Sequence, residues 1–273
     1  MSLTAIALAR GLYFAAVMLL FGGAAFGILL KKRLPIIARA ALPHWWALLL
    51  ALLAACAWFV LAAGQMAGEM TQDAIRQAAT GTLFGQLFLV RLVLLAGLAL
   101  VLKRSQRLTA LLAAAALILP SATSHAAASS PAGFALIGTS LDAVHLMACG
   151  FWIGGLAVLC VLFRRKEPNI LLALSLFSDW AMVAVLLLAM TGLINAASII
   201  LGNKGSSALL YLGVLGAKLA LVAVMLGLAA VNRFRLMPRG DDRTIARNAA
   251  LELGLGIIVL LLAGALGQLP PTL

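Results

Sequence analysis

Charge is what this sequence has least of. Only 10% of its 273 residues are charged and 64% are hydrophobic, whereas soluble domains carry about 25% charged residues. So few charges cannot cover a surface exposed to water, so the composition excludes a soluble enzyme and a disordered chain. The apolar residues form continuous runs, unlike the alternating segments of a membrane β-barrel. We therefore predict an all-α integral membrane protein with a single domain spanning residues 1–273.

Motifs that would supply energy or redox chemistry are also missing. The sequence has no Walker A motif and no Cys-x-x-Cys pair, which argues against an ATP-driven metal pump. Its three cysteines, Cys56, Cys149 and Cys160, all lie within apolar runs and are predicted to be buried thiols. The net charge is +12, but the basic residues form short clusters between apolar runs. This pattern favours orientation in a membrane over binding of nucleic acid.

Eight apolar runs approach the roughly 20 residues that a helix needs to cross a bilayer. We predict spans at residues 12–30, 45–64, 82–102, 108–126, 141–163, 180–200, 209–231 and 249–267. Pro120 lies two thirds of the way along the fourth run, where it is expected to kink the helix or to end it early. Residues 170–177 precede the sixth run and form either an interfacial turn or the start of a longer, tilted helix.

Basic residues predict the orientation of these spans. Clusters follow the first, third, fifth and seventh runs, at 31–39, 103–107, 164–166 and 233–247. Loops rich in Lys and Arg stay in the cytoplasm. Both termini and the loops at 65–81, 121–140 and 202–208 are therefore predicted to face outward.

Two short matches raise the hypothesis of an internal repeat. Phe21-Gly22-Gly23 in the first run is similar to Ile153-Gly154-Gly155 in the fifth, and the residues around Arg91 are similar to those around Lys218. Four spans in each half would give two parallel four-helix repeats. Chance similarity between apolar segments is the alternative.

Two cations are predicted near the middle of the membrane. Arg91 and Lys218 each lie nine residues from the outer end of their run, about 14 Å deep at 1.5 Å per residue. Ionisable groups at that depth are costly and often functional. The structural alternative is that each neutralises a helix end or binds backbone carbonyls between packed spans.

Histidine supplies the strongest candidate for metal chemistry. Asp142, His145 and Cys149 are spaced to share one face of the fifth span, and His145 lies in its outward half. His125 lies at the outer end of the fourth run. Two imidazoles and a carboxylate at one outward-facing pocket would suit copper or another late first-row metal. A purely structural histidine is the alternative.

Other polar and sulfur groups lie on the same outward side. Packing explains most of the methionines, but Met66 and Met70 in the loop after the second run could form an entry site for Cu(I), which prefers thioethers. Thr191 and Asn195 lie in the outward half of the sixth run. Asn195 is predicted at the depth of His145, where it could orient the imidazole or simply bridge two helices.

The segment from Asp142 to Leu156, with His145, Trp152 and the Gly154-Gly155 pair, resembles the His-Trp-Gly-Gly helix of the copper resistance protein D (CopD) family. Further pieces of resemblance occur in the same order along the chain: Ser124-His125-Ala126, Phe177-Ser178, Thr191-Gly192, Lys218-Leu219, Asn232-Arg233-Phe234-Arg235 and Leu266–Pro271. Asp179 departs from the pattern, because the family commonly has a basic residue there.

The resemblance implies an inner-membrane copper protein, so that the outward side predicted from the basic clusters, with both termini, would be the periplasm. It would act with a separate periplasmic copper-binding partner, CopC, and pass copper from the periplasm to the cytoplasm. By position, His125 and His145 would be ligands, with Trp152 beside the path. A difficulty is electrostatic, because Arg91 and Lys218 would each repel a copper ion by about 2–3 kcal/mol at roughly 6 Å.

Two other functions remain open at this stage. The protein could be a redox protein whose histidines bind haem or copper, with Arg91 and Lys218 facing haem propionates or a quinone. It could also be a membrane anchor for the periplasmic partner. A Soret band in the optical spectrum would support the redox function over transport. Cellular copper content that is unchanged in His125→Ala and His145→Ala variants would support anchoring over transport.

Overall fold

The computed structural model describes residues 3–35, 45–123, 135–202 and 209–268. Most of this part of the chain is helical and it contains no strand, which confirms the predicted all-α class. The helices are α1 (Leu3–Arg33), α3 (Trp45–Ala67), α4 (Gln72–Gly81), α5 (Leu83–Val101), α6 (Gln106–Ile118), α8 (Ala135–Arg164), α9 (Ile170–Gly202), α10 (Leu209–Val231) and α11 (Asp242–Leu266). Three short turns complete them: the 3₁₀ turns η1 (Leu119–Thr123) and η4 (Met237–Arg239), and the π-helical turn η3 (Asn232–Leu236).

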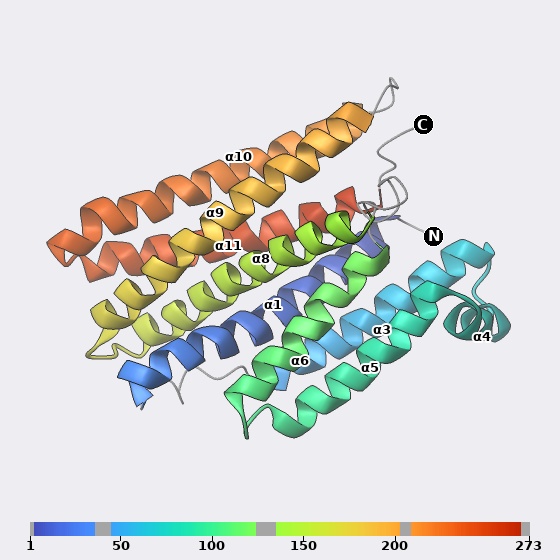
Figure 1. Ribbon diagram of the computed structural model, residues 1–273, viewed down its shortest axis with the longest axis horizontal. Helices are drawn as coiled ribbons and strands as arrows, with labels where there is room; N and C mark the ends of the chain where they lie inside the picture. Colours follow the sequence, from blue (N-terminus) through green and yellow to red (C-terminus); the bar gives the residue numbers. More distant parts are fainter. Residues whose placement is uncertain (1–2, 36–44, 124–134, 203–208, 269–273) are drawn as a thin grey trace.

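The long helices lie side by side in one bundle and alternate in direction (Figure 1). Helices α1, α5, α8 and α10 run one way, and α3, α6, α9 and α11 run the other way. Helix α1 is central, because it packs against α3, α6, α8 and α11. The first residues of α1 and the last residues of α11 therefore lie at the same end of the bundle (Figure 1).

Seven of the described helices are long and apolar enough to cross a membrane, namely α1, α3, α5, α8, α9, α10 and α11. The protein is thus a multi-pass membrane protein. The run predicted as the fourth span is shorter, because α6 ends at Ile118 and continues only as the 3₁₀ turn η1. Pro120 lacks the N–H that an α-helix would need there, so the expected early end is confirmed.

Other helix limits differ from the predicted spans. Helix α1 begins at Leu3 rather than at residue 12, and α11 begins at Asp242 rather than at 249. Helix α9 is continuous from Ile170 to Gly202, so the longer helix is the correct alternative for 170–177. Helix α4 in the loop at 65–81 was not predicted. Thr71 caps it by accepting a hydrogen bond from the backbone N–H of Ala74 (3.2 Å).

Helices α1 and α8 cross at glycines. A Cβ atom placed on Gly154 would lie 2.5 Å from the Cα atom of Gly22 and 2.6 Å from the carbonyl oxygen of Met18. Only glycine allows the two backbones to approach so closely. Gly22 and Gly154 belong to the two similar segments noted in the sequence, so these segments meet at the crossing.

Two hydrophobic clusters flank this crossing. The first joins α1, α3, α5 and α6 around Tyr13, Trp58 and Phe88. The second joins the later part of α1 to α8, α9 and α11 around Phe26 and Trp152. Two of the polar groups discussed below contact cluster members: Arg91 contacts Tyr13 and Trp58, and Glu252 contacts Trp152.

Candidate functional site

His145 on α8 is joined to α9 by a hydrogen bond. Its Nδ1 atom lies 2.8 Å from Oγ1 of Thr191, and Gly192 lies beside the same ring, since a Cβ on it would be 3.7 Å from Cε1 of His145. Thr191 is buried, and its hydroxyl donates to the carbonyl oxygen of Leu187 at 2.6 Å.

These contacts determine which nitrogen of His145 carries the proton. A threonine hydroxyl has one hydrogen, and here that hydrogen is directed to Leu187. The oxygen of Thr191 must therefore accept from the Nδ1–H of His145. In the neutral imidazole, Nε2 then keeps its lone pair, as in most histidines that bind metals. The partner of the imidazole is Thr191 rather than Asn195, which lies one helical turn further along α9.

Charged groups of both signs surround this histidine. Lys218 on α10 is close enough to interact electrostatically with His145 and with Cys149. Asp142 interacts in the same way with Cys149 and with Arg10 on α1. The predicted face of Asp142, His145 and Cys149 on α8 is therefore flanked by two cations from neighbouring helices.

The other predicted ligands are not gathered around His145. His125 lies outside the described residues. Met66 lies in the last turn of α3 and Met70 in the loop after it, and both are exposed, at 56% and 54%. Within the described ranges, the structure contains no group of three or more His, Cys, Asp or Glu side chains that could hold a metal ion.

Arg91 is packed between aromatic rings. Its Cζ atom lies 4.7 Å from the centroid of the Tyr13 ring and 4.6 Å from that of Trp58, and only 2% of the residue is exposed. Its Nε and Nη1 atoms have no hydrogen-bond partner among the described residues. Ring faces therefore surround and stabilise the guanidinium, whereas the structural alternative proposed a helix end or backbone carbonyls as its partners.

A buried acid that the sequence analysis missed lies on α11. Glu252 is 2% exposed, and Asn232 of η3 donates a hydrogen bond to its Oε1 atom at 2.8 Å. Asn248 in turn donates to Oδ1 of Asn232 at 2.8 Å. Trp152 of α8 is also a hydrogen-bond partner of this carboxyl. The available signal was a lone acidic residue inside an apolar run.

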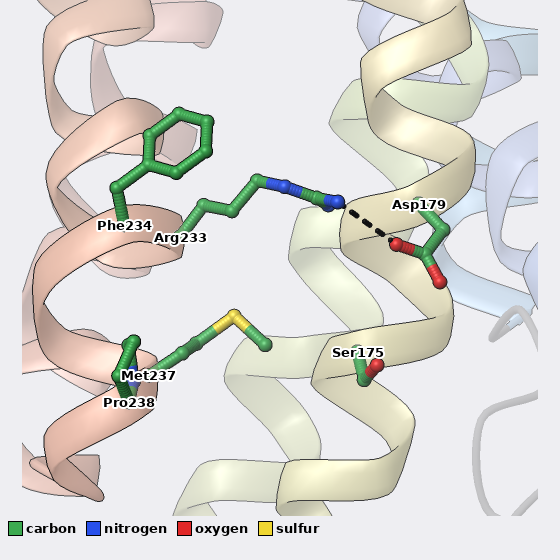
Figure 2. A pocket seen from close by; sticks show the side chains of 6 residues that line it. All are labelled: Ser175, Asp179, Arg233, Phe234, Met237 and Pro238. Atoms are coloured by element: carbon green, nitrogen blue, oxygen red, sulfur yellow. Dashed lines mark hydrogen bonds and ion pairs between the residues drawn. The ribbon is translucent and has the colours of Figure 1, made fainter.

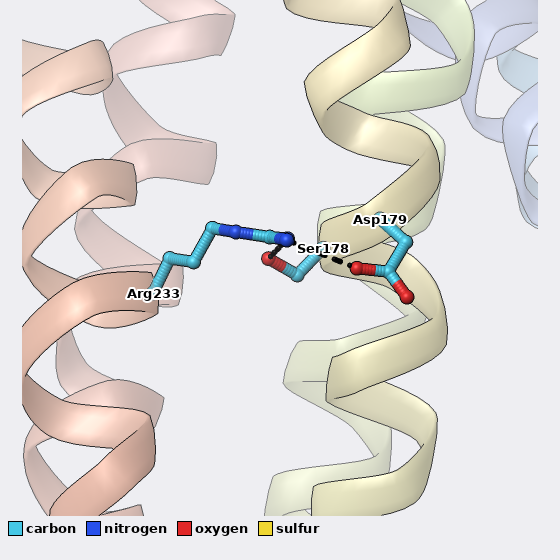
Figure 3. Close-up of polar contacts among 3 residues, drawn as sticks. All are labelled: Ser178, Asp179 and Arg233. Carbon is cyan, nitrogen blue, oxygen red and sulfur yellow. Dashed lines mark hydrogen bonds and ion pairs between the residues drawn. The ribbon is translucent and has the colours of Figure 1, made fainter.

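An open cleft of about 380 Å³ lies between α9 and the turns η3 and η4. Figure 2 shows the side chains that line it: Ser175, Asp179, Arg233, Phe234, Met237 and Pro238. Arg233 reaches across to α9, where its Nη1 atom donates to Ser178 Oγ at 2.6 Å and its Nη2 atom pairs with Asp179 Oδ1 at 3.1 Å (Figure 3). The unusual acid at position 179 thus has a basic partner.

Two family models match the chain. The model for copper resistance protein D matches residues 171–266, and the model for the N-terminal domain of copper resistance protein D-like proteins matches residues 1–135. The chain belongs to the copper resistance protein D family. Residues 136–170 lie between the two matched regions, so neither model includes most of α8 or His145.

Curated members and relatives of the copper resistance protein D family are similar over part of their length. Copper resistance protein D of Pseudomonas syringae pv. tomato is 34% identical over 152 residues, which cover 48% of this chain and 49% of that protein. Copper transport protein CutJ of Bacillus subtilis is 33% identical over 140 residues, which cover 49% of this chain and 26% of that protein. The matches therefore span half or less of these relatives. No solved structure matches.

Proposed function

We propose that this protein transports copper across the bacterial inner membrane, from the periplasm toward the cytoplasm. The observation that carries the proposal is the chain of hydrogen bonds from His145 through Thr191 to Leu187. It holds an imidazole inside a membrane bundle with Nε2 able to bind a metal. Membership of a family named for copper resistance supports copper as the cargo.

The orientation follows from the basic clusters. Helix α8 ends beside Arg164, Arg165 and Lys166, which the positive-inside rule keeps in the cytoplasm. His145 is then nearer to the periplasmic end of α8, and both chain termini are periplasmic. A cargo that reaches His145 first therefore comes from the periplasm, and a separate CopC-like copper-binding protein is the partner we propose to deliver it.

All but one of the ligands we propose lie among the residues that the structure describes, and the exception is His125. His145 Nε2 is the central ligand, with His125 as the second imidazole and with Cys149 and Asp142 on the same face of α8. Met66 and Met70 are exposed thioethers at the periplasmic end of α3, where they could take up Cu(I) first. Arg91 is packed between the rings of Tyr13 and Trp58 and is not one of these ligands.

Replacing His145 tests the proposal directly. We expect His145→Ala to lose copper binding at this position, and Thr191→Val to weaken it by about 10- to 100-fold, because partners that orient metal-binding imidazoles contribute that much. Thr191→Ser keeps the hydroxyl and should retain binding close to that of wild type. Copper content and affinity of the purified proteins are the measurements.

Equal copper content in wild type and His145→Ala would contradict the site. If His145→Ala loses bound copper but cells accumulate copper as before, the protein binds copper without transporting it, as the anchor function requires. A Soret band in the optical spectrum of the wild type would instead support the redox function with haem.

Replacement of Lys218 is expected to strengthen copper binding, whereas replacement of His145 is expected to abolish it. Its ammonium interacts electrostatically with His145, so it repels a cation bound there. We expect Lys218→Gln to bind copper several-fold more tightly than wild type. Lys103→Gln, which removes an exposed charge after α5, is the matched control and should leave the affinity unchanged. Weaker binding in Lys218→Gln would show that the lysine supports the site, and would contradict our placement of the cation.

A further inference from the structure

Glu252 lies deep in the bundle and is unused by the proposed copper site. It is ten residues from the start of α11, about 15 Å along the helix at 1.5 Å per residue. Its side chain is buried among α8, α11 and η3. An ionisable group at such depth in a membrane bundle is a candidate functional group by default.

Both described hydrogen-bond partners of Glu252 donate to it. Trp152 has only an indole N–H to offer, and Asn232 uses its amide N–H₂ because its oxygen already accepts from Asn248. This chain of donors is consistent with an acid that is ionised in one state of the protein. Among the described residues, the hydrogen-bond partners of this carboxyl are Asn232 and Trp152, neither of which carries a positive charge.

A carboxylate buried without a cation is unfavourable, because burial removes its hydration and nothing of opposite charge replaces it. Such a group takes up a proton or a cation. One amide N–H₂ and one indole N–H, both donors, do not supply the ligand atoms that a metal ion needs. A proton is therefore the cation that this set of neighbours fits.

We propose that Glu252 is a proton-binding site, and that its protonation and deprotonation are coupled to the passage of copper. The coupling rests on the proposed copper transport, whereas the proton site stands on the geometry alone. In each cycle the carboxyl binds one proton and releases one proton.

Other titratable or charged groups on the elements packed against α11 do not replace this role. On α8, the Cys160 thiol interacts electrostatically with Glu252. On η3, Arg233 is paired with Asp179 and Arg235 is exposed. The basic residues at the end of α1, Lys31, Lys32 and Arg33, are exposed, and Lys218 of α10 lies beside His145.

The open cleft lies beside the turn whose Asn232 holds this acid. Asn232, which holds Glu252, and Arg233, which lines the cleft, are consecutive residues of the π-helical turn η3. Turns of this kind within helices are frequent at functional sites. The cleft lies at the predicted cytoplasmic end, so a proton would exchange with that side.

Infrared spectra across a pH titration of the purified protein test the proton site without copper. We expect wild type to show the carbonyl-stretch band of a protonated, buried carboxyl, and to lose the band when the pH rises. Glu252→Gln, which keeps an oxygen acceptor for Asn232 and Trp152, should lack the band. Glu252→Asp should keep a band at a shifted position, and the control Glu167→Gln, outside the helices, should behave as wild type. A wild-type band unchanged in Glu252→Gln, or no titrating band in wild type, would overturn the site.

Copper uptake by proteoliposomes under an imposed pH gradient tests the coupling. Wild type is expected to respond to the gradient, whereas Glu252→Gln should lose that response. An equal response in both proteins would overturn the coupling. If wild type moves no copper, the proposed transport fails and the coupling fails with it, while the infrared result still decides whether Glu252 binds a proton.

Discussion

A Gly154→Ala variant is expected to lose about 3 kcal/mol of stability, the upper end of the usual cost of overpacking. The added Cβ would meet the Gly22 Cα at 2.5 Å, the Met18 oxygen at 2.6 Å and the Gly23 nitrogen at 2.7 Å. All three are backbone atoms, so a rotamer change cannot relieve the overlap and α1 must move away from α8. Because α1 also packs against α3, α6 and α11, the whole bundle is affected. Thermal unfolding of the detergent-solubilised protein measures the loss.

Gly227→Ala on α10 is the matched control. A Cβ on Gly227 would have no described atom within 4 Å, and alanine favours a helix over glycine by roughly 0.5–1 kcal/mol. We expect this variant to unfold at the wild-type temperature or slightly above it. If Gly154→Ala were as stable as Gly227→Ala, the close crossing of α1 and α8 would be wrong.

Truncation of Arg91 is the second large effect we expect. Arg91→Ala removes the side chain that fills the space between Tyr13 and Trp58, and leaves a cavity in the first hydrophobic cluster. Large-to-small changes at such buried positions cost about 3–5 kcal/mol. The same unfolding experiment in detergent measures this loss.

An Arg91→Met variant distinguishes the effect of lost side-chain volume on stability from the effect of lost charge. Methionine refills most of the space and removes a buried cation whose Nε and Nη1 atoms have no described hydrogen-bond partner. Replacement of buried charges by apolar residues of similar volume is often neutral or stabilising, so we expect a stability within about 1.5 kcal/mol of wild type. An Arg91→Met protein as unstable as Arg91→Ala would show that the ring contacts of the cation hold the bundle.

The helical membrane class could be predicted because it depends on composition and on run length alone. Helix ends depend on other forces. Helix α11 begins at Asp242 since Asp241 accepts a hydrogen bond from the backbone N–H of Thr244 (3.1 Å), and this cap lies outside the apolar run. Helix α4 is too polar to be recognised as a span, and it lies in a segment that was predicted to be a loop. The early end near Pro120 could be predicted, because proline acts on its own helix.

The candidate site could be predicted only in part. Spacing within one helix placed Asp142, His145 and Cys149 on a common face. Spacing cannot tell which residue of another helix meets His145, because Thr191 and Asn195 lie one turn apart on α9 and differ only in depth. The lone acid Glu252 is visible in its apolar run, but its partners Trp152 and Asn232 could not be predicted, because they come from other parts of the chain.

The turn η3 connects α9, which lines the open cleft, to the buried acid Glu252 on α11. Arg233 fastens it to α9 through Ser178 and Asp179, and Asn232 fastens it to the acid on α11. Neighbouring residues of one short turn cannot be displaced independently. A displacement of α9 relative to α11 would therefore have to move or break the contacts of Arg233 or of Asn232, so the position of α9 and the hydrogen bond to Glu252 are linked through one turn.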